Sequence, residues 1–177
     1  MIERFHLAQL NVATVLAPLT DPRMIGFVEA LDQINELAEA SPGFLWRLKD
    51  DSGNATALRP FGPDLIVNMS LWESVEALSD YVYRSEHKAY LARRKEWFAM
   101  PGKAHLVLWW IAADDLPTLE EAKRRLDLLR LLGPSPKAFT FKHRFPPPTV
   151  TCELAETEKA GLAAGFSSHA DEKRQRE

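Results

Sequence analysis

The order in which strand-like and helical patterns follow one another constrains the fold of this chain more than any other feature of its sequence. Four apolar segments are typical of β-strands, at residues 5–15, 44–49, 64–72 and 105–112. Two stretches with apolar residues at helical spacing separate them, at residues 22–39 and 73–98. Strand, helix, strand, strand, helix, strand is the ferredoxin-like order. We therefore predict an α+β fold with a ferredoxin-like antiparallel sheet and helices on one face.

Capping residues predict where several of these elements begin and end. Asp21 followed by Pro22 is a common pair at a helix N-terminus, and it predicts that the first helix begins there. Thr118 and Glu121 have the spacing of a capping box, and Gly133 is a typical stop signal. These signals predict a third helix after the fourth strand.

The strands are apolar on both of their faces, which sets a packing problem. In residues 5–15, Phe5 and Leu7 lie on one face while Ala8 and Leu10 lie on the other. Helices on one side leave the second face of such a sheet open, so something else must cover it. We predict a homodimer that packs sheet against sheet, as in a dimeric α+β barrel. The alternative cover is the third helix with the C-terminal tail of the same chain.

The composition changes after Phe145, where three prolines open a segment rich in Glu, Ala, Ser and Lys. This change predicts a ferredoxin-like domain over residues 1–145 and a mobile polar tail over residues 146–177, with one short helical segment near residues 153–162. The sequence also predicts a short strand near residues 138–142, just before this change in composition. The single cysteine, Cys152, cannot form an intrachain disulfide, which is typical of a reducing compartment.

Composition and spacing argue against several classes of partner and cofactor. The formal net charge of −3 lacks the basic excess that binds nucleic acid. The longest apolar run, residues 106–113, is eight residues long, whereas a membrane-spanning helix needs about 20. The glycines form no nucleotide-binding motif, and the histidines lack metal-ligand spacing. We predict a cytoplasmic protein with no nucleic-acid or membrane partner, no metal and no bound cofactor.

Polar residues on otherwise apolar strand faces are the first candidates for a ligand site. Gln9 and Asn11 share one face of the first strand, and Asn68, Ser70 and Trp72 share one face of the third. These two strands are neighbours in the ferredoxin-like order. We therefore expect the amide side chains to converge on one patch.

A second group of candidates lies in the second helical stretch, where Ser85 can cap a helix that continues to residue 98. Its members recur at helical spacing on one face: His87, Tyr90, Leu91, Arg94, Trp97 and Phe98. A histidine and an arginine thus interrupt an aromatic stripe. His87, with an ordinary pKa of about 6.5, is the candidate general base on this face.

Each candidate also has a purely structural interpretation. Buried amides such as Asn11 and Asn68 often hydrogen-bond only to their neighbours, because an unsatisfied group costs roughly 1–3 kcal/mol. Tryptophans such as Trp109 are more often core or interface residues than catalytic ones. Arg94 can extend its charged group into water, and His87 can be a surface residue near a helix start.

The residues around the third strand resemble a known group of proteins. Ser70-Leu71-Trp72-Glu73-Ser74, followed by Glu76-Ala77-Leu78 and Ser85-Glu86-His87, is similar to the antibiotic biosynthesis monooxygenase-like group. Together with residues 6–11 and 105–110, the pattern resembles a bacterial family of unknown function in that superfamily, over about residues 4–148. The resemblance implies a dimeric α+β barrel. It also implies cofactor-free oxygenation of polycyclic aromatics, oxidative haem breakdown or ligand binding alone, since members differ in activity.

The haem-degrading members of the group have a site made of three residues. An Asn on the first strand, a Trp on the helix that follows the W-x-S motif, and a later His form it. Asn11 matches the Asn, whereas Tyr81 occupies the Trp position and the His position falls near Tyr90 or Leu91. This departure makes haem chemistry the second choice.

We accordingly predict a small cofactor-free, oxygenase-like enzyme that acts on an aromatic or enolisable metabolite. Haem binding or breakdown is one alternative, and a non-catalytic ligand-binding or structural dimer is the other. The predicted catalytic residues, between sheet and helices, are His87, Asn11, Asn68 and Trp72. The residues predicted to bind the ligand beside them are Gln9, Tyr90, Arg94 and Trp109. His87 is assigned the role of base, the two asparagines donate to an oxyanion, and Trp72 stacks on the substrate ring.

Overall fold

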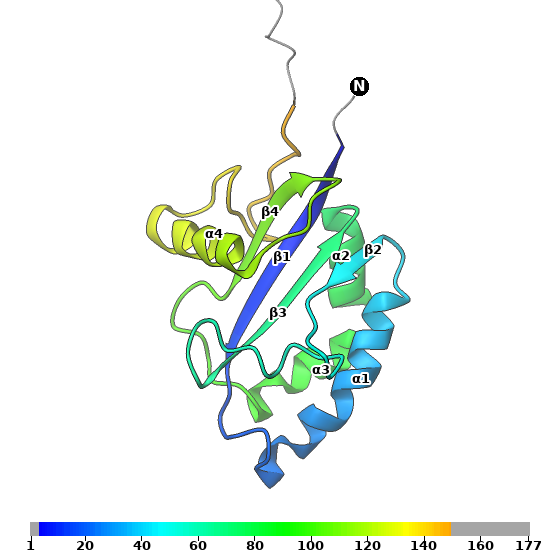
Figure 1. Cartoon of the computed structure of the whole chain (residues 1–177), viewed down its shortest axis with the longest axis vertical. Helices are drawn as coiled ribbons and strands as arrows, with labels where there is room; N and C mark the ends of the chain where they lie inside the picture. The colour runs from blue at the N-terminus through cyan, green and yellow to red at the C-terminus, as the bar shows by residue number, and fades with distance from the viewer. Residues whose placement is uncertain (1–3, 150–177) are drawn as a thin grey trace, which may run out of the picture.

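A four-stranded antiparallel sheet lies at the centre of the molecule (Figure 1). The computed structural model describes residues 4–149 of the chain. The strands are β1 (Phe5–Thr14), β2 (Phe44–Arg47), β3 (Leu65–Trp72) and β4 (Leu106–Ala112), in the order β2-β3-β1-β4. The α-helices are α1 (Ile25–Glu39), α2 (Val75–Arg84), α3 (His87–Arg93) and α4 (Leu119–Leu132). Two 3₁₀ turns are η1 (Pro22–Met24) and η2 (Arg94–Glu96). The ferredoxin-like α+β fold class is confirmed.

Capping residues lie at both ends of α4 as predicted, whereas Asp21 caps the 3₁₀ turn η1 and α1 itself begins later, at Ile25. The Asp21 carboxylate accepts a hydrogen bond from the backbone N–H of Arg23 at 2.9 Å, at the start of η1. The Thr118 hydroxyl accepts one from the backbone N–H of Glu121 at 3.1 Å, at the start of α4. Gly133, with a φ of +78°, ends α4 in the left-handed region that glycine adopts readily. No helix within residues 4–149 combines the length and the apolar character needed to cross a membrane.

The second helical stretch consists of two short helices that meet at Ser85, where the sequence predicts that a new helix begins, but the second ends at Arg93 rather than at residue 98. Between α2 and α3, the Ser85 hydroxyl donates to the backbone carbonyl of Tyr81 and accepts from the backbone N–H of His87 at 3.1 Å. The chain then tightens into η2 at Arg94. Trp97 therefore lies beyond the last helical turn, so the residues predicted to form one aromatic stripe are divided between α3 and the segment that follows it.

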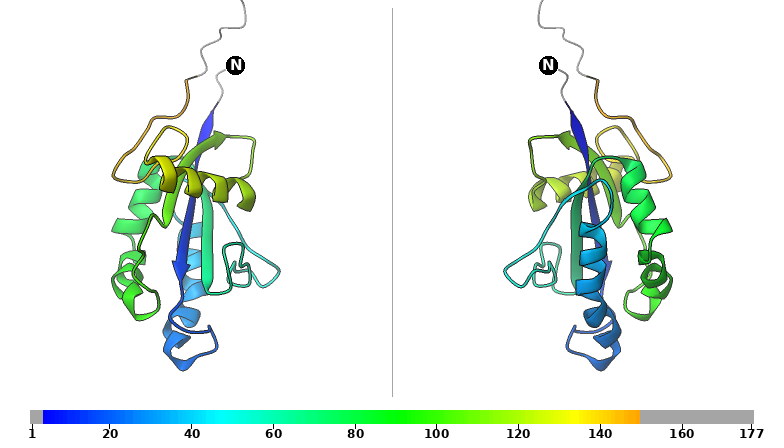
Figure 2. Two further views of the ribbon diagram at one scale, coloured as in Figure 1. Left: turned by 90° about the vertical axis from the view of Figure 1, so that its left-hand side faces the viewer. Right: turned by 90° about the vertical axis from the view of Figure 1, so that its right-hand side faces the viewer.

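The two faces of the sheet are covered by different parts of the chain (Figure 2). α1, α2 and α3 lie toward one face, which we call the α2 face. α4 crosses the other, the α4 face. Because side chains alternate along a strand, Leu7 of β1 packs with α2 residues while Leu10 packs with Leu126 of α4. Each face thus has its own apolar core.

α4 covers the face that we predicted to pack against a second copy of the chain. Leu10, Val107 and Trp109 on this face are completely buried within one chain. Leu58 and Phe61, from the loop between β2 and β3, add to the cover. Helices therefore lie on both faces rather than on one, because the third helix is amphipathic and buries its apolar side on the sheet.

The alternative in which the third helix covers the second face is thus the one found, although the tail lies outside the described residues. A homodimer stays a prediction, but α4 and the β2–β3 loop occupy the face through which we predicted it to pack. We therefore expect α4 to stay packed on the sheet whether the protein sediments as a monomer or as a dimer at micromolar concentration. Faster amide hydrogen exchange of α4 in a dimer would show that α4 is displaced and would contradict this.

A bulge in β2 changes which face its residues occupy. Regular alternation along the predicted strand 44–49 places Phe44, Trp46 and Leu48 on one side. In the structure the register with β3 shifts between Phe44 and Trp46, so Phe44 packs on the α2 face while Trp46 and Leu48 pack on the α4 face. The extra residue of a bulge reverses the alternation of side chains beyond it.

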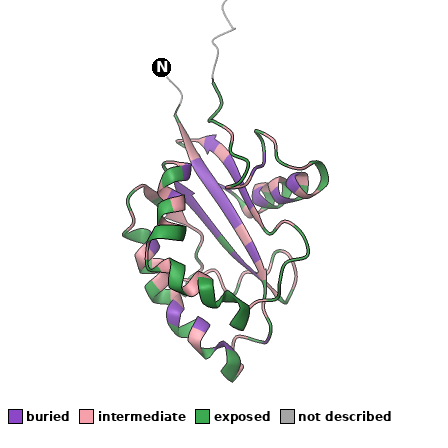
Figure 3. Ribbon diagram, turned by 180° about the vertical axis from the view of Figure 1, so that it is seen from behind, coloured by how far each residue is buried: buried purple, intermediate pink, exposed green. Residues whose placement is uncertain are grey.

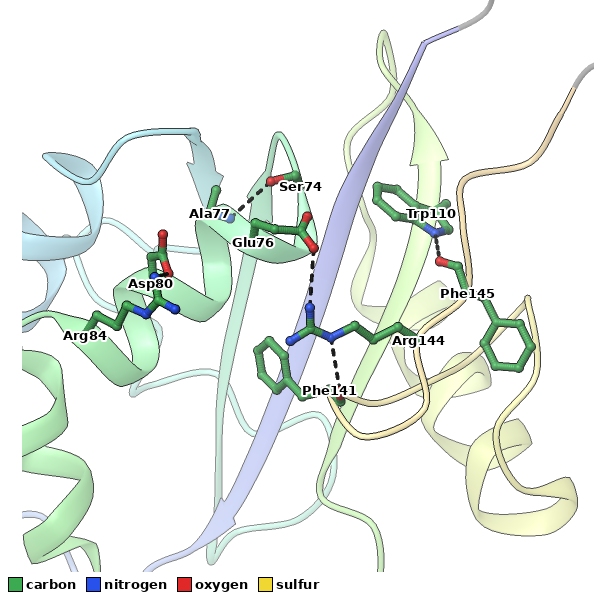
Figure 4. Close-up of polar contacts among 9 residues, drawn as sticks. All are labelled: Ser74, Glu76, Ala77, Asp80, Arg84, Trp110, Phe141, Arg144 and Phe145. Carbon is green, nitrogen blue, oxygen red and sulfur yellow. Dashed lines mark hydrogen bonds and ion pairs between the residues drawn. The ribbon is translucent and has the colours of Figure 1, made fainter.

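The segment after α4 returns to the α2 face, where polar contacts hold it (Figure 4). The strand predicted near residues 138–142 is reduced to one pair, in which Phe139 and Leu108 exchange two backbone hydrogen bonds of 2.8 Å. The Trp110 indole N–H donates to the backbone carbonyl of Phe145 at 2.8 Å, and Arg144 pairs with Glu76 of α2 at 3.3 Å. This segment therefore joins β4 to α2. The predicted boundary at residue 145 stays a prediction, and Cys152 and the predicted helical segment near residues 153–162 lie outside the described residues.

Candidate functional site

Four polar side chains lie together at the centre of the α2 face. In the register of β1 and β3, Gln9 lies opposite Ser70 and Asn11 lies opposite Asn68. All four lie on the face that Leu7 and Trp72 occupy, because side chains two positions apart on a strand share a face. We call these four residues the polar block. The convergence of amides that the sequence predicts is therefore present.

Apolar residues surround the polar block on the same face of β1, β3 and β4. They occupy the neighbouring positions of the same registers: Leu7, Ala13, Ile66, Trp72, Leu106 and Leu108. Gln9 and Ser70 are each only 5% exposed, whereas Asn68 is exposed although it lies near the middle of an inner strand. Figure 3 shows that the strands of the sheet are otherwise largely buried. The polar block is thus buried at one side and open to solvent at the other.

Hydrogen bonds connect the polar block to the ring of Trp72. The Gln9 amide nitrogen donates to the side-chain oxygen of Asn68 and, at 3.2 Å, to the Ser70 hydroxyl oxygen. The same hydroxyl oxygen accepts from the Trp72 indole N–H at 2.9 Å. Ser70 therefore fixes both the Gln9 amide and the Trp72 ring.

Two carbonyl oxygens of the polar block have no hydrogen-bond donor. Gln9 Oε1 and Asn11 Oδ1 are both buried, and neither accepts a hydrogen bond from any residue in the range 4–149. Buried acceptors in proteins are nearly always paired. Other buried polar atoms without a partner, among them His6 Nδ1 and Trp109 Nε1, occur elsewhere in the described residues, but Gln9 and Asn11 share one face of one strand. The polar block is therefore a place where one molecule can supply two missing donors.

Aromatic contacts extend from Trp72 to His87. The Trp72 and Tyr81 rings stack with centroids 5.2 Å apart and planes at 25°, and the Tyr81 and His87 rings lie 4.8 Å apart at 40°. The Tyr81 hydroxyl donates to the backbone carbonyl of Ile34 in α1 at 3.3 Å. His87 thus contacts Tyr81, and Tyr81 and Trp72 separate it from the polar block along this series of contacts.

His87 is half-buried, and a hydrogen bond fixes which of its two ring nitrogens carries the proton. Its Nδ1 lies 3.3 Å from the backbone carbonyl oxygen of Val82. A carbonyl oxygen only accepts, so Nδ1 carries the proton of this hydrogen bond and Nε2 keeps its lone pair. Burial lowers the pKa of His87, and burial also raises the pKa of the Tyr81 hydroxyl. Both rings are therefore neutral near pH 7, and Nε2 of His87 is able to accept a proton.

We expect the stability of the protein to fall in mild acid because of His87. In the unfolded chain its pKa is about 6.5, above the lowered folded value, so the unfolded state binds a proton first as the pH falls. The free energy of unfolding should decrease below about pH 6.5 and level off below the folded pKa. Urea unfolding of the parent and of His87→Gln between pH 7.5 and pH 5 measures this. The variant should show a weaker dependence, and an identical one would contradict the assignment.

The second-rank candidates are placed in different surroundings. Tyr90 donates its hydroxyl proton to Gln33 Oε1 at 2.7 Å, and Arg94 is exposed with its guanidinium donating to the backbone carbonyl of Leu91 at 2.8 Å. Neither contacts the polar block. Trp109 lies on the α4 face, beneath Leu126, so its predicted place in this site is wrong. In the Trp109-Trp110 pair of β4, it is Trp110 that faces the α2 side.

Two residues of the site were not among those assigned a catalytic or ligand-binding role from the sequence. Ser70 links Gln9 to Trp72, and its shared face with Asn68 was a signal for it. Tyr81 joins Trp72 to His87. It lies one helical turn after Leu78 of α2, but the sequence alone does not say which residue of β3 it meets.

The site offers neutral hydrogen-bonding groups rather than metal ligands. Within residues 4–149, no three His, Cys, Asp or Glu side chains are grouped as a metal site. Amide and hydroxyl side chains bind transition metals weakly but suit organic ligands with polar substituents. The arrangement is therefore suited to an organic molecule.

Comparisons with known proteins place the chain in a family but give it no activity. Among curated proteins, none matches it. A solved protein of unknown function from Nitrosomonas europaea is 16% identical, with a TM-score of 0.42 over 66% of this chain and 98% of that chain. Rv0793 from Mycobacterium tuberculosis is 16% identical, with a TM-score of 0.41 over 64% of this chain and 99% of that chain.

A further solved structure, a protein from Chloroflexus aurantiacus J-10-fl provisionally named an antibiotic biosynthesis monooxygenase, is 13% identical. Its TM-score is 0.40, over 64% of this chain and 98% of that chain. The family model for a domain of unknown function, DUF3291, matches residues 6–155. The resemblance to a family of unknown function is thereby confirmed. Since the match spans most of the 177 residues, the chain belongs to the DUF3291 family.

Proposed function

We propose that this protein binds a small aromatic or enolisable metabolite on the α2 face and oxygenates it without a bound cofactor. The observation that supports binding is the polar block, which lies in apolar surroundings and opens to solvent at Asn68. A largely apolar surface with a few polar groups is typical of small-molecule sites. The polar groups orient the ligand, and the apolar border contacts its ring. Trp72 is completely buried and stacks on Tyr81, so it supports the polar block through Ser70 rather than stacking on the substrate ring as predicted.

An oxygenation of this kind uses the electrons of the substrate itself. In balanced form, an activated CH₂ group reacts with O₂ to give a carbonyl group and one water molecule. The protein needs a base that removes one proton from carbon and donors that stabilise the negative charge on oxygen. The amide N–H groups of Asn11 and Asn68 are the proposed donors, and Nε2 of His87 is the proposed base.

The position of His87 constrains the size of such a substrate. His87 meets the polar block only through Tyr81 and Trp72 among the described contacts. A substrate that reaches both therefore extends along the face past Trp72. This favours a molecule with several fused rings over a single-ring compound.

Tryptophan fluorescence and oxygen uptake together test the proposal. Because Trp72 borders the polar block, a panel of hydroxylated polycyclic aromatics should change the emission of the parent protein. The change should be lost in Asn68→Leu and kept in Asn54→Leu, which removes an amide from the β2–β3 loop. Binding with oxygen uptake supports the enzyme, and binding without uptake leaves only a ligand-binding protein. The absence of binding by the whole panel would reject the proposal.

We expect the Soret band of haem to stay unchanged when haem is mixed with the protein. An axial histidine must present a free ring nitrogen to a flat pocket. The polar block holds no imidazole, and the ring of His87 is packed against Tyr81, which separates it from the polar block. A Soret shift that disappears in His87→Ala or His105→Ala would instead establish the haem alternative.

A further inference from the structure

The two unpartnered carbonyl oxygens of the polar block carry information about the ligand. Gln9 Oε1 and Asn11 Oδ1 belong to side chains two positions apart on β1, so their strand positions are roughly 6.8 Å apart on one face. Gln9 is 5% exposed, and neither oxygen accepts a hydrogen bond from the described part of the chain. The two atoms therefore form a pair of neighbouring acceptors.

The contacts of Gln9 establish which end of its amide is the acceptor. Its nitrogen lies 3.4 Å from the backbone carbonyl oxygen of Asn68 and also contacts the side-chain oxygen of Asn68. A backbone carbonyl can only accept, so the atom of Gln9 that faces it is the N–H donor. The carbonyl oxygen of Gln9 is consequently the atom left without a partner.

We infer that the ligand of the polar block carries two hydrogen-bond donors, hydroxyl or N–H groups, which bind Gln9 Oε1 and Asn11 Oδ1. This inference rests on the proposed function, because it concerns the same site. Carbonyl oxygens bear partial negative charge, so ionised carboxylate, sulfonate or phosphate groups are repelled there. The site thus selects a neutral molecule with two donors.

The selection follows from the cost of leaving buried acceptors unpaired. A molecule of the same shape that carries methoxy groups covers both oxygens without donating to them. A site built to hydrogen-bond a hydroxyl group rejects an analogue without that donor far more strongly than it rejects a change of size. We expect a loss of affinity of about tenfold or more when both hydroxyls are methylated.

Three naphthalenes with the same ring test this inference on the full chain. The probes are 2,7-dihydroxynaphthalene, 2,7-dimethoxynaphthalene and naphthalene-2,7-disulfonate, and calorimetry measures their binding. The dihydroxy compound should bind at least tenfold more tightly than the dimethoxy compound, and the disulfonate should not bind. A second measurement uses Asn11→Leu, which removes one acceptor that has no internal partner. This variant should lower the affinity for the dihydroxy compound but not for the dimethoxy compound. Asn54→Leu should change neither of these two affinities.

The outcomes separate the inference from the proposed function. Equal affinities of the dihydroxy and dimethoxy compounds for the parent protein would overturn the donor requirement while leaving ligand binding in place. Preference for the disulfonate would overturn it as well. Failure of all three to bind at millimolar concentration would reject the proposed binding site and, with it, the inference. The comparison on the parent protein does not depend on any variant folding.

Discussion

Replacing Trp72 with alanine is expected to lower the free energy of unfolding by about 3–5 kcal/mol. Trp72 is completely buried, and its ring stacks on Tyr81 and meets Phe44 edge-on at 5.3 Å. The substitution removes these contacts, leaves a cavity beside the sheet and deprives Ser70 of a donor. Because small domains have about 5–15 kcal/mol of stability in total, the loss should shift the urea midpoint strongly.

Two further variants separate the contributions to this loss. Trp72→Phe keeps much of the ring but removes the N–H group that donates to Ser70, so it should cost less than the alanine substitution. Trp110→Ala removes the same residue type from a half-buried position and should also cost less. A midpoint for Trp72→Ala that equals that of Trp110→Ala would show that Trp72 is not the anchor of this core.

Once a substrate is identified, His87→Ala is expected to slow its turnover by at least about 100-fold. The reason is that His87 is neutral near pH 7 and offers Nε2 as a base, while its Nδ1–H is held by Val82. General-base catalysis contributes typically about 10² to 10⁴-fold. Steady-state oxygen uptake gives the rate, and the thermal midpoint shows whether the variant is folded.

His105 supplies the matched control for this experiment. Desolvation of part of the ring also lowers the pKa of His105, although most of the residue is exposed to solvent. His105 lies just before β4, outside the series of contacts that ends at His87. His105→Ala should therefore leave turnover within about twofold of the parent rate. Full activity of His87→Ala would remove it as the base, and it would leave ligand binding at the polar block as the remaining role of the α2 face.

Local patterns were sufficient to predict most of the element boundaries. Asp21, Thr118 and Gly133 lie at the helix ends for which their side chains or backbone freedom suit them. These features act within one turn of the chain, so neighbouring residues determine them. The polar block was also predictable, because alternation places Gln9 beside Asn11 on one face and the strand order brings Asn68 next to them.

The series of contacts beyond the polar block was not predictable in the same way. That Tyr81 stacks on Trp72 depends on how α2 is rotated against the sheet. That His87 then meets Tyr81 depends on the break at Ser85, which ends one helix and redirects the next. Helix rotation and hinge angles follow from packing between elements. They cannot be predicted from the spacing of residues within each element.

The sequence by itself determined the ferredoxin-like order of elements, the helix caps and the meeting of the amides, because each depends on periodicity or on neighbours in the chain. Only the tertiary structure decided that α4 covers the second face, that Trp109 lies beneath it and that Phe44 and Trp46 occupy opposite sides. When both faces of every strand are apolar, alternation cannot tell which face meets which helix. The long-range packing of α4 and the bulge in β2 resolve that ambiguity. They thereby determine which residues belong to the site.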